Sequence, residues 1–339
     1  MARVVVVHGI GQEFLGPEQM HRDAVPALRD GVLLAGATPP TPEDVVCAFY
    51  GDLFTEPGTR SDDLPPWDEW DVEEGLEAEL LDAWRLASEA GDTAGAGGTD
   101  WAGDADWARG AAGPGVTDGA GATAGPGATD GAGAEAGAGA EAGAGYPAGT
   151  RGLLGHAAAR ALRVERVRAA LDALAGTRFF GRVSDRLLVL ALRQVRRYLT
   201  EPALRAAAQE RVAARVGPDT RVLVAHSLGS VVAYETLCAR PELPVTDLVT
   251  LGSPLGLRGI VFDRLTPAPV DGAAAWPGGI RRWTNIADRG DVVALPDRLA
   301  PRFGPAVSDQ RIDNGTRMHD LARYLSAPRT GTAIARGLG

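Results

Sequence analysis

The sequence predicts an α/β fold in which a mostly parallel β-sheet is covered by helices. Short, almost wholly apolar segments such as 3–9 (RVVVVHG) and 221–226 (RVLVAH) have the composition of strands that are buried on both faces. Segments with helical spacing or helical length follow them, and strands separated in this way pair in parallel. We therefore expect one sheet with helices on both faces.

The expected elements follow one another in a regular order along the chain. The N-terminal part predicts strands over 3–9 and 44–52 and helices over 18–36 and 72–90. A region rich in Arg, Ala and Leu predicts helices over 153–175 and 184–215. The C-terminal part predicts strands over 221–226, 245–254, 279–288 and 306–313 and helices over 228–239 and 318–326.

A low-complexity segment interrupts this order. Residues 91–149 are mainly Gly, Ala, Thr and Asp, with near-repeats such as GAGAEAGAGAEAGAG. Such a segment has little apolar surface to bury, so we expect it to be disordered. Because the parts before and after it complete one fold, we expect a single domain over 1–339 with an insertion over 55–182, which is a candidate cap.

Charge and composition exclude several classes of function. The chain has 339 residues and a net charge of −10, and its basic residues are all Arg. An acidic chain argues against nucleic-acid binding, which needs a basic surface. Cys47 and Cys238 form neither a disulfide framework nor a zinc motif. We expect no metal and no cofactor.

The N-terminus and the hydropathy pattern predict a cytoplasmic protein. The first apolar run is too short for a signal-peptide core, and a Gly-rich turn follows it at once. No window approaches an uncharged membrane span of about 20 residues. The apolar, Arg-rich stretch 179–199 leaves contact with a membrane surface open, and the sequence predicts no oligomeric state.

The stretch 220–237 (TRVLVAHSLGSVVAYETL) contains the candidate nucleophile, Ser227. A Ser between a strand and a helix is held above the sheet, and the N–H groups of the helix face a developing oxyanion. The tight turn requires small residues two positions before and after the Ser, and Ala225 and Gly229 meet this requirement. The alternative is that Ser227 only caps the helix 228–239.

A nucleophilic Ser needs a base to take its proton and an acid to orient that base. His319 follows the last predicted strand, where the His of a Ser–acid–His order falls. Asp288, at the end of the predicted strand 279–288, and Asp291, just after it, both qualify by position. We prefer Asp291 because the apolar residues after it would anchor its loop, and Asp288 is the alternative acid.

The oxyanion of acyl transfer needs two hydrogen-bond donors. The backbone N–H of Leu228 is the first, and that of Ile10, in the turn HGIGQ, is the expected second, with Gly11 as the alternative. A dinucleotide-binding turn is the rival interpretation of HGIGQ. The sequence GIGQEF lacks the third glycine that this motif requires.

At this point the chain resembles a known family. The strand ending in HGIGQ, the VLVAHSLGSVVAYE turn, LGSPLGL, WTNIADRGDVVA and the late HDLARY together resemble the α/β-hydrolase superfamily. The resemblance is strongest to its lipase/esterase branch, including GPI-inositol-deacylase-like serine hydrolases, and covers roughly 3–54 and 183–325. It implies a Ser227–Asp291–His319 triad and an oxyanion hole from Ile10 and Leu228. Val292 departs from the family, where proline or glycine often follows the aspartate.

These candidates predict a serine hydrolase that cleaves a carboxylic ester or thioester, acyl or lipid-like, through an acyl-enzyme. Gly11 and the apolar loop after residue 254, which carries Leu257 and Phe262, are the expected substrate contacts, with core packing as the alternative for each apolar residue. Two other functions stay open. One is a serine peptidase or amidase with the same triad, and the other is a non-catalytic hydrolase-fold protein that recruits partners.

Overall fold

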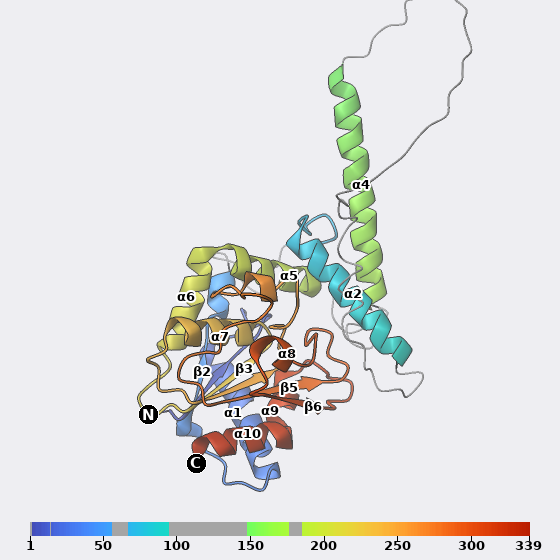
Figure 1. The fold of residues 1–339 in the computed structure, drawn as a ribbon. Helices are drawn as coiled ribbons and strands as arrows, with labels where there is room; N and C mark the ends of the chain where they lie inside the picture. The colour runs from blue at the N-terminus through green and yellow to red at the C-terminus, as the bar shows by residue number, and fades with distance from the viewer. Residues whose placement is uncertain (1, 14, 56–66, 95–147, 176–184) are drawn as a thin grey trace, which may run out of the picture. The chain divides into compact units, whose positions relative to one another are not determined.

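The structure, a computed structural model, describes residues 2–13, 15–55, 67–94, 148–175 and 185–339 (Figure 1). The chain divides into two compact units, residues 1–102 with 167–339 and residues 103–166. Most of the expected disordered segment, 91–149, lies outside the described residues. At its two ends the prediction is wrong, because α2 (Leu76–Ala94) continues past residue 91 and α4 (Ala148–Ala175) begins before residue 149.

A six-stranded parallel sheet forms the centre of the first unit. Its strands are β1 (Val4–Val7), β2 (Val45–Ala48), β3 (Val222–His226), β4 (Asp247–Leu251), β5 (Arg282–Asp288) and β6 (Val307–Ile312). Their spatial order is β2-β1-β3-β4-β5-β6, and every neighbouring pair is parallel. The predicted α/β class with a parallel sheet is therefore confirmed.

Helices cover both faces of this sheet (Figure 1). On one face, α1 (Pro17–Leu34), α9 (Leu321–Ser326) and α10 (Pro328–Leu338) share a continuous apolar core with the strands. On the other face lies α7 (Leu228–Ala239), with α6 (Pro202–Ala213) against it and α5 (Asp185–Thr200) against α6. Shorter helices in the connections are η1 (Pro42–Asp44), η2 (Gly51–Phe54), η4 (Phe262–Arg264) and α8 (Ala300–Phe303).

The C-terminal helix α10 is not evident from the sequence, because glycines reduce the helix propensity of this segment. The structure gives both of these glycines a packing role, since a Cβ on Gly337 would be 2.5 Å from Val222 Cγ2 of β3. A Cβ on Gly331 would overlap the backbone of Gly31 in α1, and a Cβ on Gly31 would overlap the carbonyl group of Leu325 in α9. Glycine at both positions therefore lets α9 and α10 approach α1 at backbone distance.

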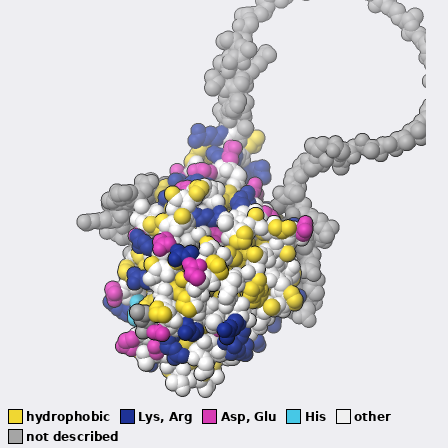
Figure 2. Space-filling view, turned by 60° about the vertical axis from the view of Figure 1, so that its left-hand side comes forward, with side chains coloured by type: hydrophobic (Ala, Val, Ile, Leu, Met, Phe, Trp, Pro, Cys, Tyr) yellow, Lys and Arg dark blue, Asp and Glu magenta, His cyan; other side chains and the backbone are white. Residues whose placement is uncertain are grey.

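The described helices include none that is long and apolar enough to cross a membrane. On the face shown in Figure 2, apolar side chains lie scattered among basic and acidic ones. Both signs of charge therefore occur on this face.

Candidate active site

The predicted site residues follow the carboxyl ends of several strands of the same sheet. Ser227 comes directly after β3, and the turn HGIGQ follows β1. Asp291 comes shortly after β5, which lies two places from β3 in the sheet. Because all these strands are parallel, their carboxyl ends lie along one edge, where open α/β sheets bind their ligands.

Ser227 occupies a sharp turn between β3 and α7. Its φ of 53° and ψ of −133° lie in a region that residues other than glycine rarely adopt, at a cost of about 1–3 kcal/mol. Gly229 makes the turn possible, because a Cβ at this position would overlap the carbonyl group of His8. The Ser227 side chain makes no capping hydrogen bond to α7. The helix-cap interpretation is therefore wrong.

The turn after β1 lies directly against Ser227. A Cβ on Gly9 would be 2.6 Å from Ser227 Cβ and 3.2 Å from Ser227 Oγ, so only glycine fits there. The next residue, Ile10, makes no backbone hydrogen bond through its N–H to any described residue. The Gly11 N–H, in contrast, donates to Gln194 Oε1 at 3.0 Å. Of the two predicted donors in this turn, the Ile10 N–H has no acceptor within the described part of the chain, whereas the Gly11 N–H is engaged by Gln194.

Leu228 is the second predicted donor of the oxyanion hole. It is the first residue of α7, and the N–H groups of the first helical turn have no acceptor within the helix. The partial positive charge of the helix N-terminus adds to the attraction for an anion at this point. An oxygen between the Leu228 and Ile10 N–H groups would therefore be stabilised from two elements.

Asp291 and His319 are in direct contact. His319 Nδ1 and Asp291 Oδ2 are 2.7 Å apart, and the Asp291 side chain is fully buried. The hydroxyl of Tyr324 donates to the same Oδ2 at 2.7 Å, and the Val293 N–H donates to Oδ1 at 3.0 Å. The carboxylate is thus held on both oxygens, and its position orients the His319 ring.

The alternative acid, Asp288, has a different role. Its carboxylate accepts hydrogen bonds from the backbone N–H groups of Gly290 and Asn314, so it closes the turn that follows β5. Burial raises the pKa of the Asp288 carboxyl, and these two N–H groups oppose the rise. Of the two candidate acids, the structure brings Asp291 and not Asp288 against His319.

Neighbours of Ser227 connect it to this pair. The ring of His226 packs on the ring of His319, with centroids 4.5 Å apart. Gly252, directly after β4, lies so close to the pair that a Cβ would be 2.7 Å from Asp291 Oδ2 and 3.0 Å from His319 Nδ1. No hydrogen bond joins Ser227 Oγ to another described residue. The structure therefore joins the candidate acid and base, and Ser227 follows a residue in contact with the base.

Two further histidines at this edge are buried and neutral. Burial lowers the pKa of His226 well below its usual value and lowers the pKa of His8 to about 4. His8 Nε2 accepts from the Tyr50 N–H at 3.1 Å, so we assign the proton to Nδ1, which donates to Gly9 O at 2.6 Å. His8 therefore ties the turn after β1 to the end of β2 and has no nitrogen left for base chemistry.

His226, Gly252 and Tyr324 are site residues that sequence reasoning misses. The signal for Gly252 is its place in LGSP, directly after a strand, where its φ is 54°. The signal for Tyr324 is weaker, since only its position in the helix after His319 points to it. Neither pattern says which side chain these residues touch.

The two predicted apolar substrate contacts are buried side chains. Leu257 and Phe262 are 2% and 1% exposed. The Phe262 ring packs edge-on against Phe303, and the guanidinium of Arg302 lies over it. Both residues are therefore packed in the core, which was the alternative interpretation, and neither offers surface to a ligand in this structure.

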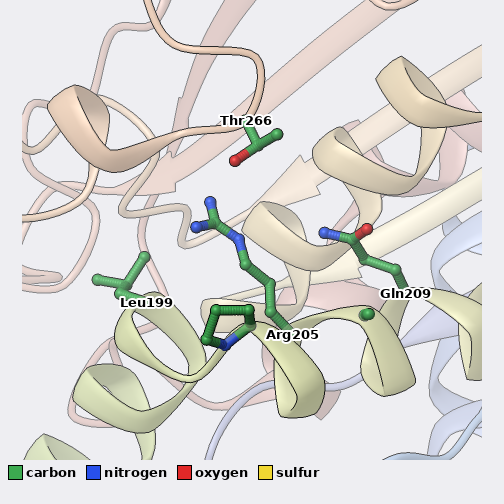
Figure 3. A pocket seen from close by; sticks show the side chains of 6 residues that line it. Leu199, Arg205, Gln209 and Thr266 are labelled. Atoms are coloured by element: carbon green, nitrogen blue, oxygen red, sulfur yellow. The ribbon is translucent and has the colours of Figure 1, made fainter.

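A cavity of about 310 Å³ lies elsewhere, between α5, α6 and the loop after η4 (Figure 3). Its lining residues are Leu199, Pro202, Arg205, Ala206, Gln209 and Thr266. Arg205 is already bound to both carboxylate oxygens of Glu235 and to Arg264 O. No candidate catalytic residue lines this cavity, so we assign it no part in the chemistry at Ser227.

Comparison with known proteins adds no relative. No family model, curated protein or solved structure matches the chain. Within the described ranges, no group of three or more His, Cys, Asp or Glu side chains is arranged to hold a metal ion. The function of this chain is therefore inferred from the geometry at Ser227.

Proposed function

We propose that the chain is a serine hydrolase of the α/β-hydrolase class, with Ser227 as nucleophile, His319 as base and Asp291 as the orienting acid. The observation that carries the proposal is the hydrogen bond between His319 and the buried Asp291 carboxylate, at the sheet edge where Ser227 has a strained backbone. Strained backbone and buried acid–base pairs are costly, and they occur together where an enzyme prepares a nucleophile.

The order of the sheet gives further support. The strand that leads to Ser227 is central, with the oxyanion turn after the neighbouring β1 and the acid after β5. Along the sequence the three residues occur in the order Ser, Asp, His, which is the order of α/β hydrolases. The proposed class is therefore supported by the fold together with the site, and the fold alone would not support it.

The proposed reaction is acyl transfer through an acyl-enzyme. His319 Nε2 takes the proton of Ser227 Oγ as this oxygen attacks the carbonyl carbon, and the oxyanion accepts from the Ile10 and Leu228 N–H groups. Asp291 stabilises the imidazolium that forms. The His319 proton then passes to the leaving alcohol or thiol, and the bond from the carbonyl carbon to it breaks. A water deprotonated by His319 releases the acid and restores Ser227.

Within this class we propose a carboxylesterase that acts on a lipid-like or other acyl ester or thioester. The steps above use only side chains and backbone groups of the chain, without a metal or cofactor. An ester is favoured over an amide as substrate because alcohols leave more readily than amines when only one general acid assists.

Labelling with a fluorophosphonate tests the proposal. Wild-type protein is expected to label and to hydrolyse 4-nitrophenyl butyrate, while Ser227→Ala loses both reactions. His319→Ala is expected to lose at least about a thousandfold in rate. Ser308→Ala, a substitution at an exposed position on β6, is the matched control and keeps both reactions.

Two results would contradict the mechanism. Absence of labelling in the wild-type protein would contradict the assignment of Ser227 as nucleophile. A Ser227→Ala variant that labels like wild type would contradict it as well. If Asp288→Asn abolishes labelling and Asp291→Asn does not, the acid must be reassigned to Asp288.

A further inference from the structure

The turn after β1 carries a pair of buried polar side chains that the proposed reaction does not use. Glu13 is 7% exposed, and neither of its carboxylate oxygens makes a hydrogen bond of regular geometry. Gln194, on α5, is 2% exposed, and its Nε2 also lacks a partner. Since buried polar groups are nearly always hydrogen-bonded, two such groups side by side require an explanation.

Glu13 and Gln194 are adjacent, and their adjacency does not satisfy them. Burial raises the pKa of the Glu13 carboxyl, while the Gln194 amide and the backbone N–H of Glu13 itself oppose the rise only in part. Gln194 is therefore close enough to influence the carboxyl group without forming a regular hydrogen bond to it. A group that both donates and accepts hydrogen bonds would supply what both lack.

The pair is also connected to the proposed oxyanion hole. Gln194 Oε1 accepts the N–H of Gly11, the residue that follows Ile10. On another side, Gly51 packs so closely on this segment that a Cβ would lie 2.8 Å from Gln12 O and 3.1 Å from Glu13 Cα. The backbone around Glu13 is therefore fixed by both contacts, and its carboxyl group is held beside a turn that faces Ser227.

We propose that Glu13 and Gln194 form a substrate subsite that binds a hydroxyl group of the ester. A hydroxyl donates one hydrogen bond and accepts others, so it would donate to a Glu13 oxygen and accept from Gln194 Nε2. An ammonium group would leave the Gln194 amide unpaired, and an alkyl chain would leave both side chains unpaired. The inference rests on the proposed function and specifies its substrate class as esters that carry a hydroxyl near the reacting carbonyl.

The experiment compares kcat/KM within two matched pairs of esters. One pair is 4-nitrophenyl 3-hydroxybutyrate and 4-nitrophenyl butyrate, and the other is glyceryl monobutyrate and propyl butyrate. The pairs place the hydroxyl on the acyl or on the alcohol side. Wild type is expected to prefer the hydroxylated member of one pair by about tenfold or more, because a hydrogen bond to a charged group carries that selectivity.

Variants identify the residues responsible. Glu13→Leu is expected to reduce the preference to near unity, and Gln194→Leu to reduce it as well. Glu18→Gln, an exposed substitution in the first turn of α1, is the matched control and leaves the preference unchanged. Glu13→Leu is also expected to raise Tm, because it removes an unpaired buried carboxyl, whereas a structural role for Glu13 requires Tm to fall.

The outcomes separate the subsite from the hydrolase. Equal turnover within both pairs by wild type, or an unchanged preference in Glu13→Leu, overturns the subsite and leaves the hydrolase standing. Labelling by fluorophosphonate without turnover of any of the four esters also overturns the subsite. Absence of both labelling and turnover overturns the proposed function and this inference with it.

Discussion

Two buried tyrosine–carboxylate pairs in this protein have opposite surroundings. In the first, the Tyr198 hydroxyl donates to Glu235 Oε2 at 2.6 Å. Arg205 binds both oxygens of the same carboxylate, and Gln209 Nε2 and the Thr266 N–H add further donors at 3.0 and 2.9 Å. The charge is neutralised by a permanent cation, and every contact joins α5, α6, α7 and the loop after η4.

In the second pair, the Tyr324 hydroxyl donates to Asp291 Oδ2 at 2.7 Å. The other described side-chain partner of this carboxylate is His319, whose charge depends on its protonation. The difference teaches that burial alone does not mark a functional acid. The Glu235 cluster contains Arg205, which keeps its charge, whereas the Asp291 cluster ends in a group that can gain a proton.

The strongest test of this contrast neutralises each carboxylate in turn. Asp291→Asn is expected to lower kcat/KM for 4-nitrophenyl butyrate by about 10⁴-fold, because the His319 tautomer and its cationic form lose their support. Glu235→Gln is expected to keep the activity of the folded protein and to lower the free energy of unfolding by about 3 kcal/mol, because Arg205 loses its buried partner. Ester kinetics and urea unfolding measure the two effects. Loss of activity in folded Glu235→Gln would break the contrast.

Removing the two tyrosine hydroxyls gives a smaller effect of the same kind. Tyr324→Phe is expected to lower kcat by about tenfold. Ester kinetics measure this loss. Tyr198→Phe, the matched control, is expected to cost about 1 kcal/mol of stability without lowering kcat. An equal kcat in the two folded variants would contradict a positioning role for Tyr324.

The smallest expected effect is a change in the pH dependence of protein stability, caused by His226, whose ring packs on His319. Burial lowers the pKa of His226 in the folded state, while the unfolded chain titrates near the usual 6.5. Below pH 6.5 the unfolded state therefore binds one more proton than the folded state. The free energy of unfolding then decreases as the pH is lowered, by up to about 1.4 kcal/mol per pH unit.

His226→Phe removes this contribution, so its Tm is expected to fall less than that of wild type between pH 7.5 and 5.5. His8, whose pKa is lowered to about 4 by burial, keeps its own contribution in both proteins. Thermal unfolding at the two pH values measures the difference. An equal fall of Tm in both proteins would show that His226 is not buried neutral.

The sheet and the Ser227 turn could be predicted because their causes are local. The strands are runs of apolar residues, such as Val4–Val7, which are fully buried. The turn depends on small residues beside Ser227. At Gly229 any side chain would overlap the carbonyl group of His8 and prevent the turn. The helix α10 could not be predicted in the same way, because Gly331 is favourable there only through its contact with Gly31 of α1.

The sequence by itself determined the α/β class, the parallel strands and a short set of candidate groups at their ends. Only the tertiary structure decided between Asp291 and Asp288, showed that the Gly11 N–H is engaged by Gln194, and buried Leu257 and Phe262 in the core. The physical reason is the range of the forces involved. Periodicity and turn sterics act between residues close in the chain, whereas Gly11 and Gln194 are 183 residues apart and meet only after the helices pack on the sheet.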